Sequence, residues 1–535
     1  MGEIDHRNVL AKMLDRRFAR RGLLRGAGLG AAALAVPAFG PQPVRAAEPG
    51  HINLAFIEYI DTLDPHFTGF LGAIMVHNNI FNGLLKITYD GQKVSFVPDL
   101  AESWDMPDDK THIFKIRPNV HFHDGTACDA EAIKWSLERV ASGKPTSPHA
   151  WKLSKLQKIE IIDPLTVKLS FATPYAFLPV ALTGSTGRAG TIVSRAAVEK
   201  YGKDFGRNPV GTGPFRFVSW RENDSIELER NPDYFEEGLP KLDRVTIKIM
   251  NEASSAVAAL MAGQVDGMNE SPLQFVKALR ANPNLTVYGE PEGNYSFVAM
   301  NVRRAPFDDV ELRRAVAFAI DREAIIKQAF FGIGEIAYSP ISPPMTGFFN
   351  KDIAKTGRGQ FFDPERAKKH RAAAKNQDVI EPVFIMSEQG PYGTRVAQTV
   401  LPMLEKIGIK PKLELMERAA WVARRNAGDF DMFDLNWVGD LDPDETLYPE
   451  FHSGEDWNYP GWSNATFDKS VEEAQVVLDV ETRRKLYETA EDALMDEAPI
   501  AIISHMPAFK IISKRVQGFQ YIPADLFNLH TVSVA

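Results

Sequence analysis

The amino-terminal segment constrains this chain most, because its pattern predicts that residues 1–46 take no part in the fold. Residues 20–25 are RRGLLR, an uncharged stretch rich in Ala, Gly and Leu covers residues 26–44, and small residues end the segment at Ala46. A basic, then apolar, then small-residue order is typical of an export signal, and the paired arginines favour the twin-arginine type. The apolar stretch is shorter than the roughly 20 residues that cross a bilayer, and it contains Pro37 and Pro41. We therefore expect export to the periplasm and cleavage, rather than a membrane anchor.

Size and charge restrict the functions that this protein can have. Of the 61 basic and 70 acidic residues, eight and three lie in residues 1–46, so the rest of the chain has a net formal charge of −14. An acidic chain is a poor partner for nucleic acids or anionic membranes. About 490 residues exceed the size of one hydrophobic core, which predicts two or three domains. Outside the cytoplasm neither ATP nor NAD(P)H is supplied, which excludes most metabolic enzymes.

The cysteine content argues against both a disulfide framework and thiol chemistry. Cys128 is the only cysteine, so the fold depends on core burial without an internal disulfide. A nucleophilic cysteine usually has a histidine partner and an electropositive setting, whereas Asp129 follows directly here. We expect Cys128 to be a small, half-buried residue beside a helix that Asp129 caps.

Hydrophobic periodicity predicts alternating strands and helices along the whole chain. Strands are expected at 51–59, 112–117, 215–219, 225–229, 245–250 and 295–301, with a strand running into a turn over 120–125, a hairpin over 159–171 and a tight loop at 211–214. Helices are expected at 70–85, 129–140, 253–263 and 309–330. Strands alternate with helices again from residue 381 onward. This order predicts an α/β protein with two regions that separate near residue 295.

A series of short blocks resembles one known family. The blocks are PDLAESW at 98–104, FKIRP at 114–118, FHDGT at 122–126, PVGTGPF at 209–215, RNPDYF at 230–235, AGQVD at 262–266, PFDDV at 306–310, RRA at 313–315 and AIDR at 319–322. In this order and spacing they resemble family 5 extracellular solute-binding proteins, the receptors of peptide- and nickel-type ABC importers. Phe235 is a small departure, since a Trp is common there.

The resemblance implies an α/β, two-lobed periplasmic-binding-protein fold of type II, with an extra subdomain in the first lobe. After the signal of residues 1–46, lobe I would comprise residues 47–82, 189–295 and 504–535. The extra subdomain would be residues 83–188, and lobe II residues 296–503. Two chain crossings, near Asn294 and near His505, would form a hinge about which the lobes close on a ligand.

The resemblance also implies where the ligand binds. Residues 437–444 are WVGDLDPD, and in peptide-binding members a Trp followed three residues later by Asp lies at the cleft. By this match Trp437 and Asp440 are site residues, and the Asp440 carboxylate pairs with the ligand's α-ammonium, an interaction that a dry cleft strengthens. The alternative is a solvated acidic loop.

A second part of the family pattern is missing. Dipeptide-binding members carry an Arg before a Pro-Tyr pair, which clamps the ligand carboxylate, but residues 389–392 are QGPY, with Gly390 at that position. A longer peptide or a non-peptide amine would fit more easily, with Gln389 near the ligand. Substitute cations would be Arg395, Arg424 or Arg425, unless these are exposed helix charges. Four aromatic residues are expected to wall the cleft or to belong to the core: Tyr59, Tyr295, Phe297 and Trp421.

No motif predicts a cofactor or a resident metal. Residues 440–444 have the D-x-D-x-D spacing of a calcium loop, but Glu445 and Phe451 occupy the positions where an EF-hand needs Gly and Glu. His121 and His123 share one face of an expected strand, yet the block around them recurs in family members with unrelated ligands. The loop at 211–214 lacks the Lys-Ser/Thr ending of a phosphate loop.

The expected function is therefore a non-catalytic, monomeric periplasmic receptor that captures a peptide or peptide-like solute and delivers it to an inner-membrane ABC permease. Within this class the alternative ligands are an opine, a nickel chelate, a glutathione-like compound or an oligosaccharide. An exported hydrolase is a distant alternative. Asp440 and Asp442 are too close in sequence to act across a sugar as an acid/base pair, and no G-x-S-x-G signal is present.

Overall fold

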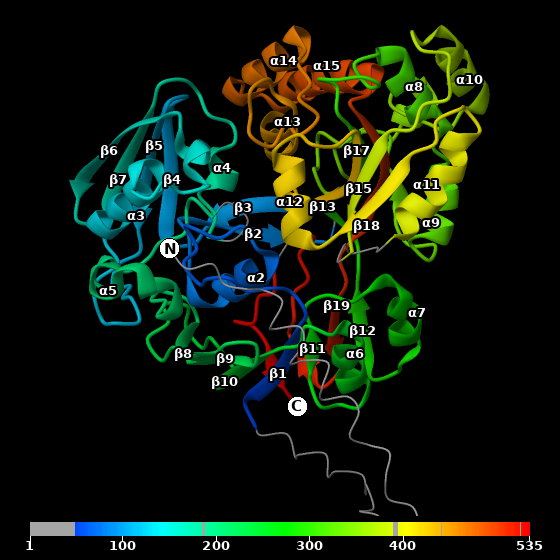
Figure 1. Cartoon of the computed structure of the whole chain (residues 1–535). Coiled ribbons are helices and arrows are strands. Elements are labelled where there is room, and N and C mark those ends of the chain that lie inside the picture. Colours follow the sequence, from blue (N-terminus) through cyan, green and yellow to red (C-terminus); the bar gives the residue numbers. More distant parts are fainter. Residues whose placement is uncertain (1–48, 92, 185–187, 389–393, 440, 525) are drawn as a thin grey trace, which may run out of the picture. The chain divides into compact units, whose positions relative to one another are not determined.

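Two large mixed sheets carry the architecture of the protein (Figure 1). The computed structural model describes residues 49–91, 93–184, 188–388, 394–439, 441–524 and 526–535. We refer to the seven-stranded sheet and the helices packed on it as lobe I, and to the six-stranded sheet and its helices as lobe II. No helix among the described residues is long and apolar enough to span a membrane.

The lobe I sheet combines strands from distant parts of the chain. Its order is β12 (Leu285–Tyr288), β19 (Lys510–Ser513), β11 (Gly267–Met268), β1 (His51–Phe56), β10 (Arg244–Ile249), β9 (Ser225–Arg230) and β8 (Phe215–Arg221). Alternate residues of β1 enter two cores, as the period of a strand requires. Ile52 and Leu54 pack on the side of α2 (Leu71–Ile80) and α5 (Arg195–Tyr201), while Ala55 packs on the side of α6 (Ala253–Met261) and α7 (Leu273–Ala281).

The lobe II sheet lies between two layers of helices. Its order is β14 (Glu335–Ile336), β18 (Ile500–Pro507), β13 (Pro291–Met300), β17 (Met432–Trp437), β15 (Val383–Ser387) and β16 (Lys412–Met416). One face packs on α8 (Val310–Ala319), α9 (Arg322–Gln328), α10 (Pro364–Ala373) and α11 (Arg395–Glu405). The other face packs on α12 (Arg418–Asn426), α13 (Pro443–Phe451), α14 (Ala465–Val476) and α15 (Val480–Glu497).

A separate antiparallel sheet and α3 (Ala130–Ser142) enclose a third core. The sheet has the order β4 (Ala101–Asp108), β5 (Thr111–Ile116), β7 (Thr166–Phe171) and β6 (Leu156–Asp163). Beside it, β2 (Leu85–Tyr89) pairs with β3 (Val94–Pro98), and the short α4 (Leu178–Ala181) joins the same core. Near the end of the chain, β20 (Val516–Gln517) pairs with β21 (Ser533–Val534).

Local signals explain where several elements begin and turn. The side chain of Asp129 accepts a hydrogen bond from the Ala132 backbone and caps α3. The predicted hairpin over 159–171 is confirmed as β6 and β7. Gly211 and Gly213 lie in the predicted tight loop. A Cβ at Gly211 would come within 2.2 Å, and one at Gly213 within 2.4 Å, of backbone atoms of Ile80, which accounts for glycine at both positions.

Several predicted elements are wrong in extent: for example, the first strand, expected over 51–59, ends at Phe56 as β1. The helix expected over 309–330 is two helices, α8 and α9, because Ile320 is extended and the Asp321 side chain starts a new helix by accepting from the Ala324 backbone. Residues 120–125 contain the expected turn, but the strand expected before it is only a single bridge between His121 and Ala127. The helix expected over 70–85 ends at Ile80, since Phe81 is extended.

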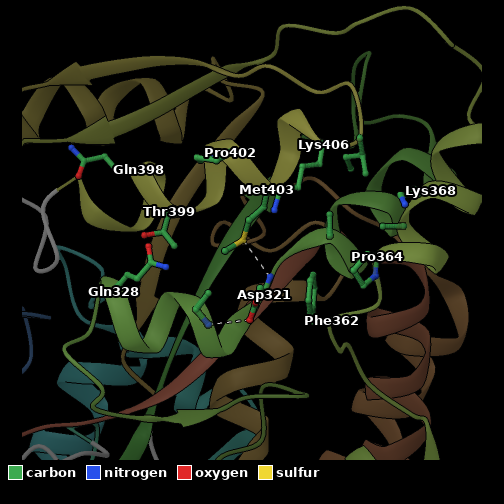
Figure 2. A pocket seen from close by; sticks show the side chains of 14 residues that line it. Asp321, Gln328, Phe362, Pro364, Lys368, Gln398, Thr399, Pro402, Met403 and Lys406 are labelled. Carbon is green, nitrogen blue, oxygen red and sulfur yellow. Dashed lines mark hydrogen bonds between the residues drawn. The ribbon is translucent and has the colours of Figure 1, made fainter.

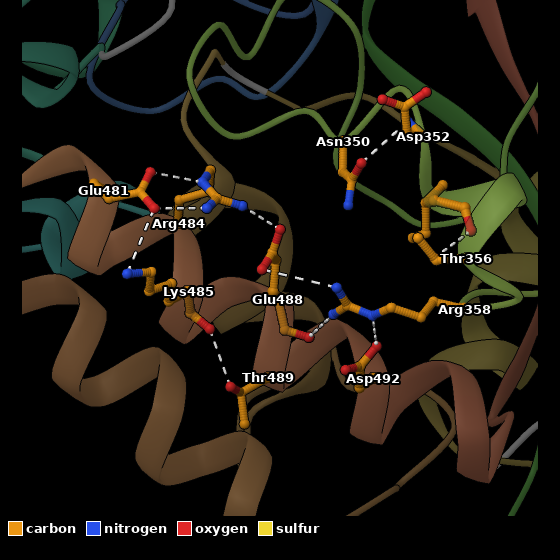
Figure 3. Close-up of polar contacts among 11 residues, drawn as sticks. Asn350, Asp352, Thr356, Arg358, Glu481, Arg484, Lys485, Glu488, Thr489 and Asp492 are labelled. Carbon is orange, nitrogen blue, oxygen red and sulfur yellow. Dashed lines mark hydrogen bonds and ion pairs between the residues drawn. The ribbon is translucent and has the colours of Figure 1, made fainter.

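Several ion pairs lie on the outer face of α15 (Figure 3). Arg484 contacts Glu481 and Glu488 on its own helix, while Arg358 contacts Glu488 and Asp492 from another segment. All of these side chains retain contact with solvent. Such exposed pairs contribute little each, and a shared network contributes somewhat more.

Candidate functional site

The two large sheets direct the carboxyl ends of their parallel strands toward each other. The chain crosses between the sheets twice, from β12 to β13 and from β18 to β19, and the crossings are paired at Tyr288 with Lys510 and at Pro291 with Pro507. Strands β1 and β11 run in the same direction as β12, toward lobe II, while β15 and β17 run against β13, toward lobe I. In α/β proteins ligands bind outside these carboxyl ends, so this edge is the candidate site.

Two of the predicted site residues lie opposite each other at this edge of lobe II. Tyr295 of β13 pairs in register with Trp437, the last residue of β17. The Trp437 ring meets Trp457 edge to face, with 5.5 Å between ring centroids. The hydroxyl of Tyr295 donates to the buried carboxylate of Glu450, and burial together with Glu450 raises the pKa of Tyr295 well above its usual value.

The remaining aromatic candidates divide between the lobes. Phe297 and Trp421 are buried in the same core as Tyr295 and Trp437, and both rings pack against Phe433. Tyr59 instead follows β1 in lobe I, is 62% exposed, and meets Phe70 edge to face at 5.1 Å. The structure thus brings four of the five aromatic residues together in lobe II and leaves Tyr59 at the edge of lobe I.

Asp440, Gln389 and the Gly390 position lie outside the described residues. The neighbouring Gly439 passes close to the start of β13, because a Cβ there would lie 2.8 Å from the Gly293 carbonyl oxygen and 2.8 Å from Oγ1 of Thr446. Only a residue without a side chain fits this approach. Gly439 is therefore held against the start of β13.

The three candidate arginines differ in their contacts. Arg424 is paired with Glu414 and Asp429. Arg425 lies over the rings of Trp421 and Tyr459, at 4.7 and 4.1 Å from their centroids. Arg395 begins α11 and lies 5.0 Å from the ring of Phe331, and no described carboxylate forms an ion pair with it.

The acidic residues after Asp440 make structural contacts. Asp442 caps α13 and receives two hydrogen bonds from Arg483, of 2.9 and 3.0 Å. Glu445 forms a buried ion pair with Lys152 at 2.8 Å, and Lys152 belongs to the segment between α3 and β6. Burial and the nearby Asp442 charge raise the pKa of Asp444 to about 7. Asp442 and Glu445 therefore face arginine and lysine, and Asp444 accepts a hydrogen bond from Gln475.

Cys128 and His123, for which the sequence allowed a chemical role, both make local structural contacts. Cys128 is buried, more deeply than predicted, and burial raises the pKa of its thiol, as expected for a packed residue. Nε2 of His123 lies 2.9 Å from the Gly213 carbonyl oxygen, so this ring supports the tight loop. The described residues contain no group of three His, Cys, Asp or Glu side chains arranged for a metal.

Acidic residues on the lobe I side of the edge were not singled out from the sequence. Glu58 follows β1, Glu270 follows β11, and the two side chains are hydrogen-bonded. Burial and the Glu58 charge raise the pKa of Glu270 well above its usual value. The buried Lys510 donates to Glu292 at the crossing. The sequence signal that could have identified Glu58 and Glu270 is their position just after buried strands.

One hollow, of about 430 Å³, lies between α9, α10 and α11, and includes Asp321, Phe362, Met403 and Lys406 (Figure 2). None of the predicted site residues lines it. A smaller hollow, of about 120 Å³, borders the first crossing at Glu290 and Pro291.

The paired crossings, the opposed strand ends and the third core define a two-lobed periplasmic-binding-protein fold of type II with an extra subdomain in lobe I. A model of the bacterial extracellular solute-binding proteins, family 5 Middle, matches residues 95–459, and the chain belongs to this family. Members of the family are receptors rather than enzymes, and they deliver solutes to inner-membrane ABC permeases.

Known proteins resemble the chain over nearly its whole length. A glutathione-binding protein GsiB of Salmonella paratyphi A is 29% identical over 526 residues, which cover 96% of this chain and 98% of that protein. The oligopeptide-binding protein AppA of Bacillus subtilis, solved with a nonapeptide, is 26% identical with a TM-score of 0.78, covering 91% and 100%. AgaA of A. tumefaciens R10, solved with agropinic acid, is also 26% identical, with a TM-score of 0.78 and coverage of 91% and 99%.

Proposed function

We propose that this receptor captures a peptide or peptide-like solute between its two lobes. The observation that supports the proposal most strongly is the opposition of the parallel strand ends of both sheets across two paired crossings, in a chain of this family. A solute bound there contacts both lobes at once. Its binding free energy therefore favours the closed arrangement, which the permease would recognise.

The ligand would be held at its two ends by opposite charges. Asp440 would pair with the α-ammonium beside Trp437, since a charge-assisted hydrogen bond is strong in a dry site. Arg395 is the best substitute for the arginine missing at position 390, because it begins α11, the next helix after β15, and has no described carboxylate partner. Gln389 would contact the solute, Tyr59 would cover it from lobe I, and Tyr295, Phe297 and Trp421 would shape the wall.

Glutathione is the first peptide to test. The relative from Salmonella is named for it, and glutathione carries the ammonium and the carboxylates that such a clamp requires. An opine such as agropinic acid, the ligand of AgaA, is the second candidate. A nickel chelate or an oligosaccharide would not require Asp440.

The proposal is tested by identifying what the protein carries. Mass spectrometry of ligand released from the native protein should reveal a peptide or peptide-like compound, and calorimetry should reproduce its binding. Asp440→Asn and Arg395→Met should each weaken binding, whereas Arg424→Met, next to the site but already paired, should not. Release of a neutral sugar, or unchanged affinity in Asp440→Asn, would contradict the assignment.

The domain limits and the export route belong to the same proposal. Lobe I would comprise residues 47–82, 189–295 and 504–535, the subdomain residues 83–188, and lobe II residues 296–503. The crossings between β12 and β13 and between β18 and β19 lie close to the predicted hinge positions. We propose twin-arginine export from residues 20–25, which lie outside the described residues. Arg20→Lys/Arg21→Lys should leave uncleaved protein in the cytoplasm, as cell fractionation would detect.

A further inference from the structure

Asp434 is a charged residue in the interior of a central strand. It lies on β17, between β13 and β15, and pairs in register with Val298. Its neighbours Met432 and Phe433 are fully buried in the cores on the two faces of the sheet. The Asp434 side chain itself is half-buried, and a carboxylate that loses part of its hydration is costly unless it is paired or hydrogen-bonded. Asp434 therefore requires a physical explanation that packing alone does not supply.

The Asp434 carboxylate has no partner in another described residue. Among the described residues it forms no hydrogen bond or ion pair beyond its own backbone N–H, and burial raises its pKa to about 7. Three fully buried carboxylates of lobe II differ: Asp442 binds Arg483, Glu445 binds Lys152, and Glu450 accepts from Tyr295. Asp434 is thus left without the internal partner that each of these carboxylates has.

The surroundings of Asp434 are polar toward the candidate site. On the same face of the sheet, Ser296 of β13 lies opposite both Asn436 of β17 and Ser504 of β18. The hydroxyls of Ser296 and Ser504 are 3.0 Å apart. Farther from the crossings this face is apolar, with Val298, Met300 and Met432 in the core. A polar row therefore leads from the strand ends to Asp434, which lies three residues, about 10 Å, inside the end of β17.

We propose that Asp434 binds a cationic group of the solute, an ammonium or guanidinium on a side chain, and that the receptor selects cationic peptide-like solutes. This inference rests on the proposed function and specifies its substrate class. A long basic side chain reaches into the polar row while the ends of the solute stay at the strand ends. Its charge supplies the partner that the fold does not.

The opposite side of the candidate site agrees with this sign of charge. Glu58, Glu270 and Glu292 lie at the lobe I edge or the first crossing, and Lys510 is the buried cation that donates to one of them. Glu58 and Glu270 lie against each other, and the charge of Lys510 also acts on Glu270. Acidic groups on both sides favour a positively charged solute over an anionic one, so lysine peptides are expected to bind more tightly than glutathione.

The experiment compares matched solutes on matched proteins. Calorimetry is performed with dipeptides, tripeptides and pentapeptides that carry lysine, norleucine or glutamate at one position, and with glutathione. Norleucine keeps most of the length of lysine without its charge. The proteins are the mature wild type, Asp434→Asn, and Asp109→Asn, which makes the same charge change at an exposed turn far along the chain.

We expect the wild type and Asp109→Asn to bind the best lysine peptide at least about tenfold more tightly than its norleucine counterpart, a difference of about 1.4 kcal/mol. Asp434→Asn should lose this preference while it binds the norleucine peptide within about threefold of the wild type. Equal binding of lysine and norleucine peptides by the wild type, or a lysine preference that survives in Asp434→Asn, would overturn the inference. Failure of every peptide to bind would instead overturn the proposed function.

The comparison of lysine and norleucine peptides on the wild-type protein needs no variant, so it tests the preference for a cationic solute even if Asp434→Asn folds poorly. Asp434→Glu provides a second variant with the charge displaced by one methylene. It should keep the sign of the preference and reduce its size. Circular dichroism and thermal unfolding of each variant establish that the lobes are intact before binding is compared.

Discussion

Two acidic regions of lobe II lie within ten residues of each other and differ in how their charge is balanced. At the start of α13, Asp442 is bound by Arg483 and Glu445 by Lys152, and all four side chains are buried. On the inner face of β17, Asp434 has no partner in another described residue. In the first region both carboxylates have their partners within the chain, and the pairs hold elements together. In the second region the carboxylate would obtain its partner from a bound solute. A carboxylate withdrawn from solvent is thus a marker of function mainly where its partner is missing.

Removal of Arg483 should have the largest effect on stability. Arg483→Met leaves Asp442 buried without its bidentate partner, and it also removes hydrogen bonds to the Tyr487 hydroxyl and the Ala474 carbonyl oxygen. We expect the free energy of unfolding to fall by about 3–5 kcal/mol, measured by urea denaturation. The double variant Arg483→Met/Asp442→Asn should recover part of the loss. A loss below about 1 kcal/mol in the single variant would show that the pair is not needed.

Removal of Lys152 should have the next largest effect. Lys152→Met leaves Glu445 buried, and we expect a loss of about 3 kcal/mol near neutral pH. The loss should shrink as pH falls, because protonation of Glu445 removes the charge that Lys152 neutralises in the wild type. Denaturation of Lys152→Met and of Lys152→Met/Glu445→Gln at several pH values checks this. A loss that is independent of pH would point to packing of the lysine stem instead.

Neutralising Asp434 should increase the free energy of unfolding, in contrast to the two substitutions above. Burial raises its pKa from 3.8 to about 7, so the folded protein binds the proton more tightly than the unfolded chain. The wild type therefore loses stability as pH rises from about 4 to 7, and Asp434→Asn does not. Without ligand, the free energy of unfolding of the variant should rise relative to wild type by about 2 kcal/mol between pH 5 and pH 8. A relative decrease would mean that Asp434 has an internal cation as partner.

The smallest effect is expected at Arg484, the neighbour of Arg483 on the outer face of α15 (Figure 3). Its pairs with Glu481 and Glu488 remain partly solvated. Arg484→Met should cost about 0.5 kcal/mol, and this cost should disappear at high salt. Denaturation with and without added salt provides the measurement. Equal losses for Arg483→Met and Arg484→Met would remove the contrast between buried and exposed pairs.

Much of the fold could be predicted because its signals are local. Asp129 caps the helix that it was expected to cap, and the loop at Gly211 and Gly213 is the predicted close approach. The helix expected over 309–330 was wrong because both halves are amphipathic, and the cap made by Asp321 is decided by one side chain. Periodicity does not distinguish a continuous helix from two helices of the same phase.

The site was less predictable because its partners are distant in sequence. Asp442 and Arg483 are 41 residues apart, and no spacing rule relates Lys152 to Glu445. Asp434 stands between apolar residues of a strand, where a single acidic residue has no local signature. The aromatic candidates were drawn from strand ends, but most are buried in one core. The positions of Asp440 and Gln389 remain predictions.

The pairing of β19 with β11 and β12 sets a condition on biosynthesis. Residues 510–513 lie between strands formed by residues 267–268 and 285–288 of lobe I, so that sheet is interrupted until almost the entire chain has been synthesised. Domains usually fold in order from the amino terminus as they emerge from the ribosome. Here the first lobe to emerge is the last to be completed, and a nascent chain that stops before residue 510 leaves the edges of β11 and β12 exposed to chaperones and proteases.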